Sequence, residues 1–256
     1  MLRAALLPSL VLVLPACAPT IWGMARYAEM GLDGDVLIAD AGVSASNDFD
    51  ALGLDDEEST PGFVGDFKWG SPHLTVSQQS SSFSGDGTLD ATISIGGDTI
   101  SAGADVASDL DLGLTNATLT FDILPTSMLE LGVGFGVNLI DVDAKFVEDG
   151  TGETVETDEM LPAPVLAVRG GAALGPVEIQ GLLSGISYDG GDESIEYFDL
   201  DLYGRYSFLG GNNRLSGSLV LGWRESSLDV EYEDDDSDVE LDLGYSGPFV
   251  GLQLRF

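Results

Sequence analysis

Basic residues are scarce in this sequence, and their scarcity excludes a large class of partners. Nine Lys and Arg residues face 44 Asp and Glu residues in a chain of 256, so the formal net charge is −35. Nucleic-acid binding needs clustered Lys and Arg to neutralise phosphate groups. Disordered acidic chains lack the Leu, Val, Phe and Tyr that are plentiful here. We therefore expect a folded protein with no nucleic-acid partner, whose acidic residues lie where water or cations screen them.

Cysteine and histidine each occur once. Cys17 alone cannot form an intrachain disulfide, and with His73 as the sole histidine a structural zinc site is excluded. No spacing of Ser, His and Asp predicts a catalytic triad, and the lone His73 argues against a lipid-modifying enzyme. We expect no enzyme activity, no cofactor, and a structural role for His73 beside a turn.

A long apolar run is also missing, because no stretch reaches the ~20 residues of a transmembrane helix. Residues 1–17 (MLRAALLPSLVLVLPAC) carry the basic residue Arg3 near their start, continue with a short apolar segment and end in small residues, which predicts a signal peptide and export. Leu14 to Cys17 resembles the lipobox of bacterial lipoproteins, with Cys17 as the lipidated residue. Ordinary cleavage near Ala16 is the other interpretation, and both stay open. A membrane protein without helices must be a closed barrel, because lipid offers backbone groups no partners.

Alternation of apolar with polar or small residues dominates the chain. From Leu129 to Leu139 every second residue is apolar, and Glu, Gly or Asn stands between, which is typical of a strand with two different faces. We predict an all-β, antiparallel up-and-down barrel over 34–256, with 18–33 as a linker or short helix. Ten strands are preferred, with eight as the alternative, and a soluble β-sandwich is the alternative fold. The ten strands are expected near 34–46, 61–69, 72–84, 108–124, 128–146, 161–173, 176–188, 194–209, 214–231 and 238–256.

Short and long connections alternate along this predicted barrel, as in bacterial outer-membrane barrels with short periplasmic turns and longer outer loops. The acidic residues gather in the windows 47–60, 147–160 and 229–240, which we therefore expect to form acidic extracellular loops. The carboxylate oxygens of Asp234, Asp235 and Asp236 suggest a weak calcium site as one interpretation. The window lacks the spacing of an EF-hand, so solvated loop charge is favoured and no metal is expected.

The polar faces of the strands carry charged residues that we expect to pair inside the lumen. Residues 85–107 predict a hairpin around Gly96-Gly97 that extends the barrel wall beyond the membrane. Aromatic residues near strand ends, such as Trp69, Trp223 and Tyr245, predict interfacial girdles. The predicted lumen charge network comprises Lys68, Asp122, Glu130, Arg169, Glu178, Asp199, Asp201, Arg205, Arg224 and Arg255.

Several short motifs together resemble small Gram-negative outer-membrane β-barrel proteins, broadly of the OmpX and OmpW kind, and a bacterial family marked by a Gly-Gly hairpin. The resemblance rests on the hairpin Gly96 to Ile100 and on the final strand. Such barrels end in an aromatic residue after alternating apolar residues, a segment that the barrel assembly machinery recognises, and Gly251, Leu254 and Phe256 match it. The resemblance implies the cell outer membrane as location, with membrane lipid, lipopolysaccharide and the assembly machinery as partners. It implies no catalytic residues and leaves the oligomeric state open.

The function expected from these features is a structural or surface-interaction barrel. A barrel of about eight strands is just filled by its own side chains, so we expect a narrow, largely closed lumen. The alternative is a narrow, porin-like channel for small cationic or apolar solutes.

Overall fold

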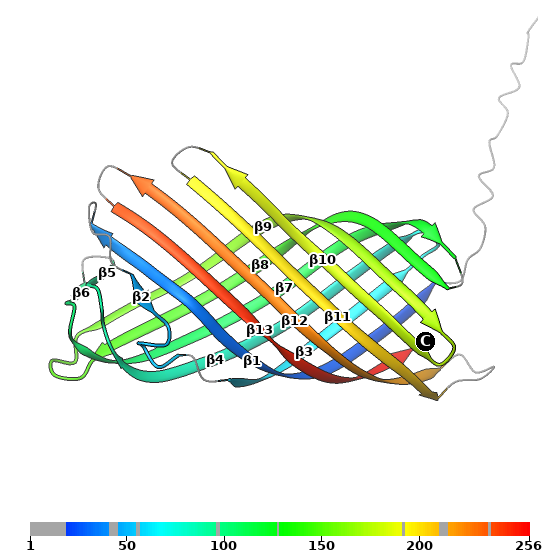
Figure 1. Ribbon diagram of the computed structural model, residues 1–256, viewed down its shortest axis with the longest axis horizontal. Coiled ribbons are helices and arrows are strands. Elements are labelled where there is room, and N and C mark those ends of the chain that lie inside the picture. The colour runs from blue at the N-terminus through cyan, green and yellow to red at the C-terminus, as the bar shows by residue number, and fades with distance from the viewer. Residues whose placement is uncertain are drawn as a thin grey trace, which may run out of the picture.

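Ten antiparallel strands form one closed barrel in the computed structural model of the chain (Figure 1). The structure describes residues 19–40, 46–54, 57–95, 98–126, 128–190, 193–209, 215–234 and 237–256. Each strand pairs with its sequence neighbours in the ring, and β13 pairs with β1 to close it. The ring consists of β1 (Thr20–Asp40), β3 (Glu58–Lys68), β4 (Pro72–Thr88), β7 (Asp105–Pro125), β8 (Leu129–Glu148), β9 (Thr154–Leu174), β10 (Val177–Asp189), β11 (Glu193–Leu209), β12 (Ser216–Asp234) and β13 (Ser237–Arg255).

The all-β, ten-stranded barrel predicted from the sequence is thus confirmed, and the alternatives of eight strands and of a sandwich are wrong. Three further short strands lie outside the ring of ten. β2 (Asn47–Asp48) pairs with β1, and β5 (Ile93–Ile95) pairs with β6 (Asp98–Ile100) as a separate two-stranded sheet. No helix in the described ranges has the length and apolar character to cross a membrane.

The prediction of a linker or short helix over 18–33 is wrong, because β1 begins at Thr20. In this segment Met24, Ala28 and Met30 face inward, while Ile21 and Tyr27 are exposed. Apolar residues on both faces erase the alternation that marks the other strands. The segment is a strand because β3 and β13 pair with its two edges, a tertiary effect that local pattern does not report.

At one end of the barrel the connections 41–57 and 89–104 are longer than any at the other end, whereas 149–153, 190–192 and 235–236 are as short as the turns opposite, so the predicted alternation of short and long connections holds only in part. We name the end with the connections 69–71, 126–128, 175–176 and 210–215 the short-turn end, and the opposite end the long-loop end. The first strand begins and the last strand ends at the short-turn end. Two of the predicted long acidic loops are mostly strand, because β8 runs to Glu148 and β9 starts at Thr154, while β12 and β13 leave only 235–236 between them. Much of the acid therefore lies on extended strands.

Polarity inverts along the strands. Near the short-turn end of β7, Phe121 and Ile123 are exposed on the outer wall while Thr118 and Thr120 are buried inside. Toward the long-loop end the outward residues are acidic, as at Asp109 and Asp111 on the same strand, and the inward residues between and after them are apolar. β8 follows the same course. The buried inward residues of this outer half include Leu110, Leu112, Leu114, Ile140, Ala144, Phe146, Val155, Ala163, Val165, Leu228 and Leu243.

The length of the strands explains the inversion. β8 has 20 residues, which at ~3.3 Å per residue and a tilt of ~45° rise roughly 47 Å. An apolar band of ~25 Å is enough to cross the hydrocarbon layer. About half of the barrel therefore extends beyond the apolar band, and there the wall meets water on its outer face.

The Gly-Gly hairpin does not extend the barrel wall, so that prediction is wrong. β5 contacts both β1 and β9, and β6 contacts β9. Four ring strands separate β1 from β9 on either side, so an element that touches both lies across the mouth. Leu89, Ala91, Ile93 and Ile100 are buried there. The hairpin turns inward because its apolar residues gain more from the apolar interior than from water.

Candidate functional site

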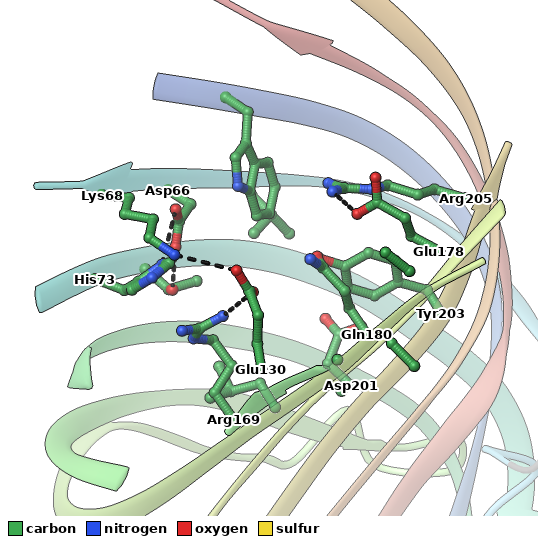
Figure 2. A pocket seen from close by; sticks show the side chains of 18 of the residues that line it. Asp66, Lys68, His73, Glu130, Arg169, Glu178, Gln180, Asp201, Tyr203 and Arg205 are labelled. Carbon is green, nitrogen blue, oxygen red and sulfur yellow. Dashed lines mark hydrogen bonds and ion pairs between the residues drawn. The ribbon is translucent and has the colours of Figure 1, made fainter. Parts of the chain in front are cut away.

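A cavity of about 360 Å³ occupies the interior at the short-turn end (Figure 2). Its walls carry side chains of both charges together with Trp22 and Tyr203. These side chains converge because inward positions recur at every second residue of each strand. The cavity is the candidate site, since several buried ionisable side chains converge on it.

His73 and four charged neighbours form one side of the cavity. The His73 ring lies between two carboxylates, with Nδ1 3.5 Å from Asp66 Oδ1 and Nε2 3.3 Å from Asp122 Oδ2. Lys68 Nζ lies 3.0 Å from Asp122 Oδ2, and Arg169 also pairs with Asp122. His73 follows the turn 69–71 and is buried in this group.

Glu130 joins the two bases of this group. Lys68 Nζ and Arg169 Nη1 lie 3.1 Å and 3.0 Å from its carboxylate oxygens, and Figure 2 shows Glu130 between them. Asp122 and Arg169 belong to β7 and β9 and meet across Gly132 of β8, which is their register partner. A Cβ at Gly132 would lie 3.5 Å from Arg169 Nη2. The Arg169 side chain thus passes directly over Gly132 to reach Asp122.

The opposite side of the cavity carries a smaller polar group. Arg205 forms an ion pair with Glu178 of the neighbouring strand, and Tyr203 Oη donates a hydrogen bond to Gln180 Oε1 at 2.8 Å. Arg255 lines the cavity at its rim and is exposed. None of the ion pairs in the described residues includes Arg255.

A buried layer of charge closes the inner end of the cavity; we name Arg26, Asp199, Asp201, Arg224 and Gln79 the charge layer. Arg26 pairs with Asp201, and Arg224 Nε lies 3.3 Å from Asp199 Oδ1. Arg224 Nη1 donates to Gln79 Oε1 at 3.1 Å. Gln79 is on β4 and Arg224 on β12, which three ring strands separate on one side and five on the other. The bond therefore crosses the lumen.

Aromatic groups pack beside the charge layer and lead to the apolar outer half. The Arg26 guanidinium lies 5.0 Å from the centroid of Phe249, within cation–π range. Tyr245 Oη accepts a hydrogen bond from Gln79 Nε2 at 2.9 Å and is buried. The prediction that Tyr245 belongs to an interfacial girdle is wrong, whereas Trp69 and Trp223 are exposed on the outer wall.

Nine of the ten residues of the predicted charge network take part in ion pairs inside the barrel, and Arg255 is the exception. The sequence missed Arg26, because its segment was expected to be a linker. The predicted network also left out Asp66, although its alternation places it on the polar face of its strand, and His73. The alternation of β3 and β4 puts both on the inward face, and this signal could have found them.

The remaining sequence-predicted sites lie at the chain ends and in one loop. Leu254 and Phe256 are exposed on the outer wall, and Gly251 is buried against β1. Cys17 and the signal peptide, like Asp235 and Asp236, fall outside the described residues; Asp234 ends β12. Within the described ranges no three His, Cys, Asp or Glu residues are placed to hold a metal ion.

On the outer wall beyond the apolar band, acidic residues face each other on adjacent strands. Asp242 of β13 is the register partner of Asp35 on β1 and of Asp229 on β12, which in turn is opposite Glu196. Like charges directly opposite in a sheet destabilise it. Partial burial, followed by repulsion from Asp229 and Asp35, raises the pKa of Asp242 above its ordinary value.

Comparison with known proteins supports the fold and nothing finer. No protein-family model matches the chain, and no curated protein matches it. The outer-membrane protease OmpT of Escherichia coli has a similar structure, with a TM-score of 0.52 and 8% identity over 93% of this chain and 96% of that chain. Neisserial surface protein A gives a TM-score of 0.36 with 11% identity over 92% and 97% of the two chains. AlkL, solved in DMPC bilayers, gives 0.34 with 12% identity over 93% and 90%.

The last two scores are too low to support an argument. The likeness to OmpT, at so low an identity, carries the architecture alone and no catalytic residue. The chain therefore has the β-barrel fold of an outer-membrane protein.

Proposed function

We propose that this protein is an integral outer-membrane barrel of a Gram-negative bacterium that does not conduct solutes and has a structural or surface-interaction role. The observation that carries this proposal is the charge layer. Arg224 and Gln79 join opposite walls through a direct hydrogen bond, and Arg26 with Asp201 fills the space beside them. Side chains of the apolar outer half and the hairpin β5–β6 stand above this layer. A solute that enters the short-turn end thus meets two closed zones in series.

The proposed orientation has the short-turn end in the periplasm and the acidic outer half outside the cell. Exposed Leu, Val, Ile and Phe residues gather on the outer wall toward the short-turn end, where lipid can cover them. Charge on a lipid face costs ~2–4 kcal/mol for Arg or Lys at mid-bilayer. The acidic rows lie beyond that band, where water and divalent cations screen them. Lipopolysaccharide is the partner that this surface would meet first.

A structural role rather than catalysis also agrees with the geometry of the cavity. Lys68 and Arg169 pair with Asp122 and Glu130, and in the part of the chain that the structure describes the two His73 ring nitrogens lie next to carboxylates and not next to a hydroxyl group. A general base must reach the proton that it abstracts. Here both ring nitrogens face acids, so the arrangement favours a rigid support.

Single-channel recording in planar bilayers tests the proposal. The chain is refolded, and its folding is confirmed by heat-modifiable gel mobility. We expect folded protein that gives no discrete conductance steps. Discrete, cation-selective steps from protein that passes the gel test would overturn the proposal in favour of the narrow channel.

A further inference from the structure

The outer half of the barrel has the polarity of a water-soluble ligand-binding barrel. Its wall carries acid on the outside, as at Asp109, Asp111 and Asp143, and apolar side chains inside, as at Leu112 and Ile140. The interior of a barrel of about eight strands is either filled by its own side chains or just wide enough to hold one small ligand, and the diameter grows with strand number. Ten strands therefore enclose more room than a barrel filled by its wall side chains alone.

Two segments of the chain, 46–54 and 89–104, add apolar side chains to this interior, and they are attached differently. The segment 46–54 is bonded to the wall through its backbone, with the Phe49 amide 3.1 Å from the Gly34 carbonyl and the Thr88 amide 3.2 Å from the Ala51 carbonyl. Gly85 makes this approach possible, since a Cβ there would lie 1.9 Å from the Gly53 carbonyl oxygen. Segment 46–54 is thus a fixed part of the wall.

The hairpin segment 89–104, in contrast, is bonded mainly to itself. The Leu89 amide donates to the Ala104 carbonyl at 3.0 Å and the Gly103 amide to the Leu89 carbonyl at 2.7 Å. In the described part of the chain, its hydrogen bond to the remaining barrel runs from the Ala91 amide to Asn47 Oδ1 at 2.9 Å. Burial of its apolar side chains, rather than a sheet ladder, keeps it in the mouth.

We propose that the outer half of the barrel is a binding compartment for an uncharged, apolar small molecule, and that the hairpin β5–β6 occupies this site until such a molecule takes its place. The chemical class follows from the surfaces that the hairpin covers. Ile93 and Ile100 are buried among apolar side chains of the walls. A charged ligand would lose its hydration there without gaining a partner. The inference goes beyond the proposed function, because binding above the charge layer needs no conduction.

The test compares two single variants in the full chain with Cys17→Ser, reconstituted in lipid nanodiscs. Ile100→Asp puts a carboxylate on the buried face of β6 and disfavours the docked hairpin. Ser101→Asp adds the same charge at the next, exposed position and is the matched control. The probe is N-phenyl-1-naphthylamine, which is uncharged and apolar, and its fluorescence is titrated against empty nanodiscs as blank.

We expect saturable binding near one probe per barrel, with an apparent Kd for Ile100→Asp about tenfold or more below that of Ser101→Asp. The apparent affinity rises in proportion to the fraction of barrels whose site is open. Equal titrations of the two folded variants would overturn the inference. Both variants are also recorded in planar bilayers, where they are expected to stay silent; discrete conductance steps would count against the proposed function alone.

A second pair of substitutions tests the hairpin without a buried charge. Asn47→Cys with Ala91→Cys, again in the Cys17→Ser background, places two thiols where the side chain of residue 47 meets the hairpin. Oxidation then ties the hairpin into the mouth, and reduction releases it. We expect probe binding to fall at least tenfold on oxidation and to return on reduction. Unchanged binding in the oxidised protein would refute displacement of the hairpin.

Discussion

The buried pair Arg224–Asp199 gives the sharpest test of the charge layer. Arg224 is 1% exposed and Asp199 5%, and their closest atoms are 3.3 Å apart. At an effective dielectric constant of about 20, Coulomb attraction at this distance is about 5 kcal/mol. Desolvation of both groups offsets much of that gain, so the pair adds little net stability. Removal of one partner is nevertheless costly, because the remaining charge is buried without its hydration shell and without its counter-ion.

Arg224→Met therefore should cost about 3–5 kcal/mol in the free energy of unfolding, the usual loss when one partner of a buried pair is removed. Asp199 then keeps a hydrogen bond from Asn116 Nδ2 at 3.5 Å and the weaker attraction of Arg26. The double variant Arg224→Met with Asp199→Leu removes both charges, and we expect it to lie within about 1–2 kcal/mol of the native chain. Urea unfolding in lipid vesicles, followed by tryptophan fluorescence and gel mobility, measures all three proteins. If the double variant is as unstable as the single one, packing and not charge governs this layer.

Three further predictions concern the loop, the acidic wall and the C-terminus. Gly85→Val should displace segment 46–54, because even a Cβ at this position would lie 1.9 Å from the Gly53 carbonyl oxygen. Limited proteolysis of this variant should then cut within 46–54. The control variant Gly150→Ala adds its Cβ in open space and should resist the protease as the native chain does. Asp242→Asn should raise stability at pH 7. The raised pKa means that ionised Asp242 opposes folding above the unfolded-state pKa, so the gain should vanish as the pH falls below that value, and a gain that persists in acid would contradict this cause. Deletion of Phe256, which is exposed beyond β13, should lower the amount of folded barrel in cells without changing unfolding of refolded protein, as quantitative blots and urea titration can check.

The barrel itself could be predicted from the sequence because its outer wall and lumen differ in polarity over most strands. Apolar residues alternate so regularly from Leu129 to Leu139 that the sequence predicts both the strand and the residues on each of its faces. Nine inward charges could be assigned by parity alone, since a residue two positions away along a strand faces the same side. The pairing of specific partners, such as Asp122 with Arg169 across Gly132, could not. It depends on register between strands, which no single strand encodes.

The first strand and the hairpin escaped sequence analysis for a different reason. Met24, Ala28 and Met30 face a lumen that the sequence pattern predicted to be polar, so their strand looked irregular. The hairpin that carries Ile93 and Ile100 was predicted to continue the sheet of the barrel wall. Both errors assume one polarity for the whole interior. Along β7 and β8 every second residue keeps facing inward, but the inward residues change from polar to apolar. Alternation therefore predicts that a strand exists but not which of its faces meets water.

The inversion of polarity along the strands determines which side chains must fill the outer half of the barrel. Within the membrane, contact with lipid favours apolar residues on the outer face of the barrel. Outside the membrane, the outer face meets water and the hydrophobic effect favours apolar residues in the interior. A strand that obeys both must exchange its faces once, near the boundary, as β7 does between Leu114 and Phe121. Apolar residues that become inward at that boundary need something to pack against across a ten-stranded lumen. The chain supplies Phe49, Leu52 and the hairpin, and of these only the hairpin lacks a backbone ladder to the wall, which is why it is the part that an apolar molecule can replace.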